Sequence, residues 1–476
     1  MAEDQSQGQM LEEKLTKKYS YVWQDMTESE RQESFNLAER YRIFLDQGKT
    51  ERESIRYLVQ QAKAAGFRAL SEYRQENDTL KPGDKVYVMD REKQLVLMVI
   101  GQEPLEQGAN LIASHVDSPR LDLKPNPLYE EEGLAWLKTH YYGGIKKFHW
   151  VQMPLALHGV VITADGQKRE IVIGEDPQDP IFTITDILPH LAKEQMEKKI
   201  REAITGESLN ILIGGIPYPD DKVKQPVKLA ILEKLHQQYG ITEEDFVSAE
   251  IEAVPAGKAR DVGLDRALIG AYGQDDRVCA WASWEAISKI TNPPRTAVAL
   301  FVDKEETGSA GNTGMQGNFL ELVMVDVAQL LANSDTTWRN ILSNSKALSA
   351  DVNAAFDPNF GNVFDKLNSS RLGKGVVLTK YTGSGGKGGT SDAHAEFVGE
   401  VRRLFNQHKI IWQTGELGAV DQGGGGTIAM FMARYGMEVL DCGVALLGMH
   451  SPLELASKGD VYMLSRGYQV FFDALT

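Results

Sequence analysis

The chain has 476 residues, of which 42% are hydrophobic and 25% charged, a composition typical of a folded globular protein. Its formal net charge of −16 at pH 7 provides no basic excess for binding nucleic acid or anionic lipid, so neither is an expected partner. The length exceeds that of one usual hydrophobic core and predicts two domains, or one domain with a large insertion.

The first 19 residues do not have the pattern of an export signal. They are polar and charged, and no later stretch reaches the roughly 18 apolar residues of a membrane span. The only two cysteines, Cys279 and Cys442, lie in apolar segments, where a buried free thiol is expected. These features predict a cytoplasmic protein.

Helical periodicity is the main feature near the N-terminus. Residues 27–66 repeat apolar side chains at helical spacing, and Thr27 and Thr50 are placed as N-caps, which predicts two helices. Three strand-like runs follow at 85–90, 95–100 and 110–115.

The character of the chain changes over residues 121–256. Short alternating segments there predict strands, and a charged stretch at 191–204 predicts a helix between them. Strand, loop and helix units then return, with strands predicted at 297–302, 376–379, 439–442 and 444–447. We therefore predict a catalytic α/β domain formed by residues 1–120 and 257–476, interrupted by an inserted β-rich domain at 121–256.

Acidic residues and histidines gather in short segments that follow strand-like runs. Open α/β sheets bind ligands at the carboxyl ends of their strands, so these segments are expected to meet. They span residues 113–118, 272–277, 301–309, 349–352 and 448–452. Together they predict a site for two metal ions.

The first of these segments contains a histidine and an aspartate at a strand end. His115 and Asp117 are two residues apart, so their side chains share one face of the strand. His115 can then bind a metal through one ring nitrogen while Asp117 holds the other. Taken alone, a His-x-Asp pair is more often a buried hydrogen-bonded pair, so the metal interpretation depends on the other segments.

Two pairs of adjacent carboxylates follow. Asp275 and Asp276 precede the helix-like run 278–290, where they could cap the helix or bridge two cations. Glu305 and Glu306 end an apolar strand, and neighbours on a turn cannot both face one ion. One glutamate can therefore bind a metal while the other acts as a general base.

Asp351 and His450 complete the set, although each could also be a polar residue whose hydrogen bonds are satisfied in the core. Two histidines and three carboxylates fill two metal positions. Each position receives one nitrogen and one terminal carboxylate, and the third carboxylate is shared as a bridge.

Eight segments together resemble the aspartyl aminopeptidases, the M18 family in the clan of co-catalytic zinc exopeptidases, and they are closer to its bacterial branch. The resemblance runs through nearly the whole chain. It implies a three-layer α/β/α catalytic domain of the zinc-exopeptidase type with an inserted β-rich dimerisation domain. The segments are SHVDSPRLDLKP (114–125), YGG (142–144), LPHLA (188–192), GQDDR (273–277), DKEETGS (303–309), SAD (349–351), GGGTI (424–428) and MHSP (449–452).

The resemblance also implies roles for individual residues. Two divalent ions would be bound, with Zn first and Mn or Co as alternatives. His115 and Asp351 would hold one ion, Glu306 and His450 the other, and Asp275 would bridge them. Glu305 would be the general base, Asp117 would hold His115, and the Asp275–Asp276 peptide bond would be cis.

The implied activity is the removal of N-terminal residues from peptides, through a metal-bridged water and the glutamate base. The implied assembly is a homo-oligomer, with dimers built into a tetrahedral dodecamer and His190 reaching the neighbouring subunit's site. The chain lacks the two histidines that eukaryotic members carry after Ser-Ala-Asp351, which puts an acidic preference in doubt. Lys380 or Lys387 could supply a positive charge for an acidic substrate, or could be a solvated loop residue.

Three other interpretations are open at this point. Residues 383–388 fit Gly-x-Gly-x-x-Gly, but the surrounding glycines make this nucleotide-binding pattern weak. Another dinuclear-metal hydrolase, such as a deacylase or carboxypeptidase, would use the same ligands. A non-catalytic self-assembling scaffold would be expected to lack a metal ligand or Glu305, but the five candidate ligands and Glu305 are all present.

Overall fold

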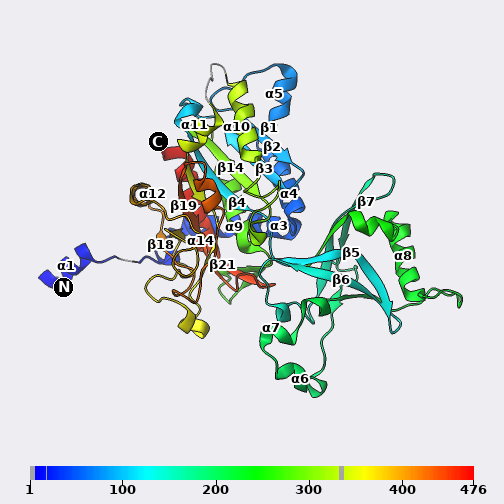
Figure 1. Cartoon of the computed structure of the whole chain (residues 1–476). Coiled ribbons are helices and arrows are strands. Elements are labelled where there is room, and N and C mark those ends of the chain that lie inside the picture. Colours follow the sequence, from blue (N-terminus) through cyan, green and yellow to red (C-terminus); the bar gives the residue numbers. More distant parts are fainter. Residues whose placement is uncertain (1–5, 18, 332–336, 476) are drawn as a thin grey trace.

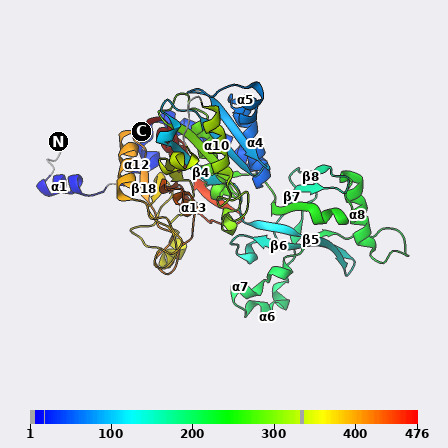
Figure 2. The same ribbon diagram turned by 45° about the horizontal axis from the view of Figure 1, so that its top comes forward.

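The computed structural model describes residues 6–17, 19–331 and 337–475. Figure 1 shows a main body of helices around a sheet and a second lobe of strands beside it. In Figures 1 and 2, helix α1 (Gln7–Leu15) extends away from the main body. Among the described residues, no helix has both the length and the apolar character needed to cross a membrane.

The main body is built on a nine-stranded sheet. Its centre is formed by four neighbouring parallel strands, β14, β4, β15 and β19. All residues of β14 and β4 are buried, and so are most of those in β15 and β19, as expected for strands covered on both faces. In sheet order the strands are β1 (Arg68–Ala69), β2 (Lys85–Asp90), β3 (Gln94–Val99), β14 (Thr296–Val302), β4 (Ala109–His115), β15 (Lys346–Ser349), β19 (Glu438–Gly443), β17 (Val376–Thr379) and β18 (Trp412–Thr414).

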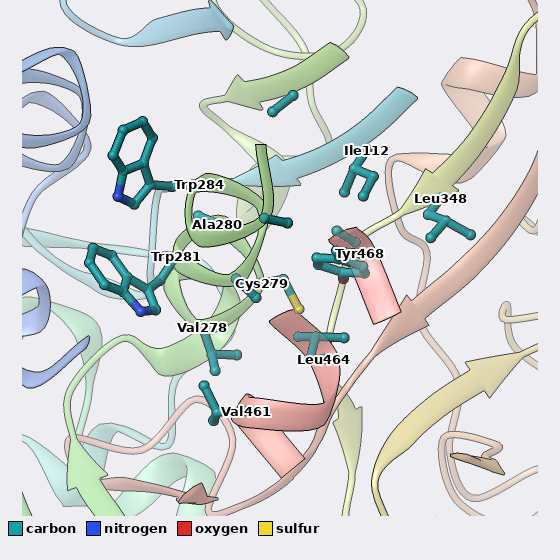
Figure 3. Close-up of a cluster of buried hydrophobic side chains, with 14 of the residues drawn as sticks. Ile112, Val278, Cys279, Ala280, Trp281, Trp284, Leu348, Val461, Leu464 and Tyr468 are labelled. Atoms are coloured by element: carbon teal, nitrogen blue, oxygen red, sulfur yellow. The ribbon is translucent and has the colours of Figure 1, made fainter. Parts of the chain in front are cut away.

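Helices cover both faces of this sheet, and alternate strand residues enter two separate hydrophobic cores. Leu97 belongs to one core and its neighbour Met98 to the other. The first core, part of which Figure 3 shows, contains α3 (Glu28–Gln47), α4 (Glu51–Ala64), α9 (Gln274–Ile287), α12 (Ala395–Gln407) and α14 (Lys458–Ala474). The second contains α5 (Leu70–Glu76), α10 (Phe319–Leu330), α11 (Trp338–Ser343) and α13 (Ala429–Ala433). The predicted three-layer α/β/α architecture is confirmed.

Local sequence signals predicted the first two long helices correctly. Thr27 and Thr50 cap α3 and α4, and each side chain accepts a hydrogen bond from the backbone N–H three residues later. Glu30 and Glu53 bond back to the cap N–H groups and complete two capping boxes. A short helix, α2 (Val22–Asp25), precedes them.

The second lobe holds a seven-stranded antiparallel sheet with its own core. Helix α8 (Pro226–Tyr239) packs on this sheet and was missed in the sequence, although it has Pro at its first position and Gly240 at its C-cap. In sheet order the strands are β8 (Lys168–Ile173), β7 (Leu155–Ile162), β11 (Ala249–Pro255), β5 (Arg120–Glu131), β6 (Leu134–Tyr142), β10 (Ile211–Gly214) and β9 (Thr183–Ile184).

The single helix predicted at 191–204 was wrong. Two one-turn helices, α6 (Lys193–Met196) and α7 (Ile200–Ala203), occupy this stretch. Neither helix has a buried residue, so no tertiary packing supports a longer one.

A third sheet, of five short strands, positions the segments that contain Asp275, His450 and Glu454 at the edge of the main sheet. Asp275 follows its strand β13, His450 follows β20, and β21 begins at Glu454. In sheet order the strands are β12 (Arg260–Val262), β13 (Leu268–Ala271), β21 (Glu454–Ser457), β20 (Ala445–Leu447) and β16 (Asn353–Ala354).

Candidate active site

The predicted metal ligands meet beyond the carboxyl ends of the parallel strands β14, β4 and β15. His115 ends β4, the turn η6 (Glu305–Thr307) follows β14, and Asp351 follows β15. Because these strands are neighbours and run parallel, their ends place the side chains together.

Asp275 lies at the centre of the cluster, between two histidines. Its Oδ1 is 3.2 Å from Nε2 of His115, and its Oδ2 is 3.1 Å from Nε2 of His450. The same His450 nitrogen is 3.4 Å from Oε1 of Glu306. One carboxylate therefore presents one oxygen to each of two histidines, an arrangement suited to a ligand that bridges two metal ions.

The potential ligand atoms form two overlapping groups. Atoms of His115, Asp275 and Glu306 lie within 4.8 Å of one another, and so do atoms of His115, Asp276 and Asp351. The Asp275–Asp276 peptide bond is cis, as predicted. Asp276, the neighbour of the central carboxylate, is thus also part of the cluster.

Asp117 connects the histidine at the end of β4 with the glutamate turn. Its Oδ1 lies 3.3 Å from Nδ1 of His115 and accepts the backbone N–H of Glu305 at 3.1 Å. Its Oδ2 accepts the backbone N–H of Glu306 at 3.2 Å and the hydroxyl of Tyr142 at 2.7 Å. One buried carboxylate thus fixes the backbone of both glutamates.

Glu305 is an acid of the cluster whose pKa lies near neutrality. Its Oε2 is 4.0 Å from Nε2 of His115. Burial, together with the carboxylates of Asp117 and Asp275, raises the pKa of Glu305 to about 7. A group with this pKa can both accept and return a proton near physiological pH.

In three other acids of the cluster the charged form is disfavoured. Burial and neighbouring carboxylates raise the pKa values of Asp276, Glu306 and Asp351 well above the usual range. Burial lowers the pKa of His450, but contact with Asp275 outweighs this effect and raises that pKa to about 10. These shifts are the electrostatic signature of acids crowded together out of water.

The donor set fits divalent cations. Both carboxylate oxygens of Asp276 and Oε1 of Glu306 are buried without a hydrogen-bond partner, which is costly unless a cation compensates. Imidazole nitrogen with carboxylate oxygen is a ligand combination that Zn²⁺ accepts. The residues present are therefore suited to hold metal ions.

Sequence reasoning missed Glu454, which holds the segments of two candidate ligands. Its Oε2 accepts the N–H of Asp275 at 3.0 Å, and its Oε1 accepts the N–H of His450 at 2.7 Å. The side chain is buried, and burial raises the pKa of Glu454 to about 8. The only sequence signal was an acid between Leu453 and Leu455, just after the Met-His-Ser-Pro segment.

A second contribution missed in the sequence comes from the end of β6. The Nδ1 group of His450 donates to the carbonyl oxygen of Gly144 at 3.0 Å, which leaves Nε2 facing Asp275 and Glu306. The YGG segment was noted only as a marker of resemblance. The structure places it against the cluster.

Two predicted substrate-binding residues lie outside the cluster. Lys380 binds Asp392 at 2.8 Å, as does Lys387 from the glycine-rich loop. His190 is exposed in the 3-10 turn Pro189–Leu191 of the second lobe.

A pocket of about 190 Å³ opens beside the cluster. Asp275, Glu305, Asp351 and His450 form one side of it. The remaining lining residues are Val352, Asn353, Thr379, Thr382, Leu417, Gly424, Gly425, Gly426, Thr427, Asp441 and Met449. The pocket is therefore placed to take a group attached to the reacting bond.

A histidine–carboxylate cluster at the strand ends of an α/β/α fold is a site of the kind found in metal-dependent hydrolases. Comparison with known proteins agrees. The profile of the Aminopeptidase I zinc metalloprotease (M18) family matches residues 44–472. A Clostridium acetobutylicum protein named "Probable M18 family aminopeptidase 1" is 51% identical, over 96% of this chain and 99% of its own length. The chain belongs to the M18 family and is an aminopeptidase of that family.

Solved structures show the same relationship. An M18 aminopeptidase from Thermotoga maritima is 44% identical, with a TM-score of 0.91 over 97% of this chain and 100% of that one. The Saccharomyces cerevisiae mApe1 dodecamer is 21% identical, with a TM-score of 0.74 over 91% of this chain and 96% of that one. At that identity the yeast protein shows a shared fold alone.

Proposed function

We propose that this chain removes single N-terminal residues from peptides and that it uses two bound divalent ions as cofactors. Zn²⁺ is the favoured ion. His115 and Asp351 would hold one ion, Glu306 and His450 the other, and Asp275 would bridge. The observation that carries the proposal is the placement of the Asp275 oxygens, one near each histidine.

The residues divide the chemical work among themselves. Bound ions would lower the pKa of water and polarise the peptide carbonyl. Glu305 takes the proton of the attacking water and returns it to the leaving amine. Asp117 keeps Glu305 in place through its backbone N–H and orients His115 through Nδ1. Free carboxylate oxygens beside the pocket would hold the substrate α-amino group and so restrict cleavage to the first residue.

The decisive test is Glu305→Gln, which keeps the shape of the side chain and removes the base. We expect hydrolysis of aminoacyl-p-nitroanilides to fall by about 10²- to 10⁴-fold while metal content, measured by mass spectrometry, stays at the wild-type value. Glu438→Gln, at a half-exposed position outside the pocket, is the matched control. More than about a tenth of the wild-type kcat in Glu305→Gln would refute the base assignment.

The same assay separates the alternatives. A deacylase would cleave N-acylated amino acids in preference to free aminoacyl substrates, and a carboxypeptidase would act on peptides with a blocked N-terminus. A non-catalytic scaffold would cleave none of them. All three outcomes contradict the proposed aminopeptidase reaction.

We also propose that the chain forms a homo-oligomer through the second lobe, with dimers assembled into a dodecamer like the one named for the yeast protein. Exposed apolar side chains gather in residues 181–216 of this lobe, where a monomer would leave them in water. They are Ile181, Ile187, Leu188, Leu191, Met196, Ile200 and Ile216. His190 lies in this segment and would reach a neighbouring subunit's site. Light scattering on the purified chain measures the mass directly.

The proposed organisation divides the chain into a catalytic domain, residues 1–120 and 257–476, and an inserted dimerisation domain, residues 121–256. Its support is the separate core of the seven-stranded sheet between Arg120 and Pro255. The free, buried thiols of Cys279 and Cys442 fit a reducing compartment, so we place the protein in the cytoplasm.

A further inference from the structure

We propose that Tyr142 is a positioning residue for the metal centre, and that the end of β6 makes the seven-stranded sheet part of the active site. The kinetic part of this inference rests on the proposed function, whereas its metal-binding part stands independently.

Tyr142 acts on the glutamate turn through Asp117. Its hydroxyl donates to Oδ2 of Asp117 at 2.7 Å, the shortest of the contacts made by that carboxylate. The carboxylate in turn accepts the backbone N–H groups of Glu305 and Glu306. The tyrosine hydroxyl therefore fixes the rotation of the group that sets the position of the proposed base and of a proposed ligand.

The tyrosine ring is itself held in place. Arg120, its cross-strand partner on β5, stacks on the ring with the guanidinium 3.9 Å from the centroid. The Nε of Arg120 lies 2.8 Å from Oδ1 of Asp122 and 3.0 Å from Oε2 of Glu252. Because both acids belong to the same sheet, the orientation of Tyr142 depends on that sheet.

The two residues after Tyr142 also touch the proposed ligands. Gly143 has φ +72°, and a Cβ there would lie 3.3 Å from Cβ and from Oε2 of Glu306. Only glycine combines this backbone conformation with so close an approach. The carbonyl of Gly144 accepts Nδ1–H of His450 and so directs Nε2 toward Asp275. Tyr142 and Gly144 thus bond to Asp117 and His450, and Gly143 between them lies where a side chain would crowd Glu306.

The arrangement makes a specific prediction about mechanism. Removing the Tyr142 hydroxyl frees Asp117 to rotate and loosens the glutamate turn, from which only Glu305 lines the substrate pocket; neither Tyr142 nor Asp117 lines it. Metal affinity and kcat should therefore change, whereas KM should not. A purely structural role would lower stability and leave metal affinity per folded molecule intact.

The experiment compares Tyr142→Phe with Tyr141→Phe in the full-length protein. Tyr141 precedes Tyr142 on β6, is exposed, and projects from the opposite face of the strand. Metal-stripped protein is titrated with Zn²⁺ against a chromogenic chelator, and the reconstituted protein is assayed with an aminoacyl-p-nitroanilide. For Tyr142→Phe we expect Zn²⁺ affinity and kcat each to fall by about 10- to 100-fold, with KM within about twofold of wild type.

Wild-type Zn²⁺ affinity and kcat in Tyr142→Phe would overturn the proposal, and so would equal losses in Tyr141→Phe. If the wild-type chain cleaves no aminoacyl substrate, the proposed function fails. The Zn²⁺ titration still decides the role of Tyr142 in that case.

Discussion

Glu454→Gln tests how far the metal site depends on a residue that binds no metal. The glutamate accepts backbone N–H groups of Asp275 and His450, at 3.0 and 2.7 Å. Glutamine keeps the volume but offers one acceptor oxygen, and its NH₂ group faces the other N–H. That backbone N–H loses its acceptor and meets a second donor, and each unpaired buried donor costs about 1–3 kcal/mol. If that cost falls on the metal-bound arrangement, Zn²⁺ affinity drops by about 5- to 150-fold.

The assay is the same chelator competition, with thermal melting of the metal-free protein as a second readout. Glu285→Gln is the matched control, because Glu285 is also buried and pairs with Arg40 and Lys289 at the far end of α9. The control should lower the melting temperature and leave Zn²⁺ affinity unchanged. Equal affinity losses in both variants, or none in Glu454→Gln, would refute the reasoning.

Substrate choice and pH dependence give two further tests. Among the described residues that line the pocket none is Lys or Arg, and Lys380 is bound to Asp392. We therefore expect kcat/KM for Leu-p-nitroanilide to exceed that for the Asp analogue by about tenfold or more. A preference for the Asp substrate would contradict this prediction. Burial lowers the pKa of His158, but hydrogen bonds with Glu175 and Glu53 outweigh it, so the pKa in the folded state is raised. The stabilisation that His158 provides is therefore full below about pH 6.5 and is lost as pH rises through the folded-state pKa. The melting-temperature gap between wild type and His158→Gln should be wider near pH 6 than near pH 8.5, and a constant gap would disprove the assignment.

The sequence predicted best those elements that local chemistry determines. The helices α3 and α4 begin at Thr27 and Thr50 because a hydroxyl and a glutamate three residues later satisfy free N–H groups. The stretch 191–204 carried helical charge patterning but no apolar face that another element covers, and it forms only two single turns. Periodicity identifies a helix reliably where tertiary packing completes it.

The same distinction holds for the candidate site, where residues with a local sequence signal were predicted and their long-range contacts were not. His115, Asp275 and the Glu305–Glu306 pair were found because each sits at or just past the end of a strand-like run. For His115 and the two glutamates, the strands are parallel neighbours that end together. Their supporting contacts have no such local signal. His450 meets the carbonyl of Gly144 across 306 residues of sequence, and any residue type offers a carbonyl.

The supporting contacts also explain why the cluster can be so acidic before any ion is bound. Asp117 and Glu454 receive four backbone N–H groups and one hydroxyl, so their oxygens are paired with donors and do not need metal. Asp276 and Glu306 keep buried oxygens without hydrogen-bond partners. The fold thus pairs with donors the carboxylates that shape the site, and it leaves unpaired oxygens on those that face its centre, which bound cations would compensate.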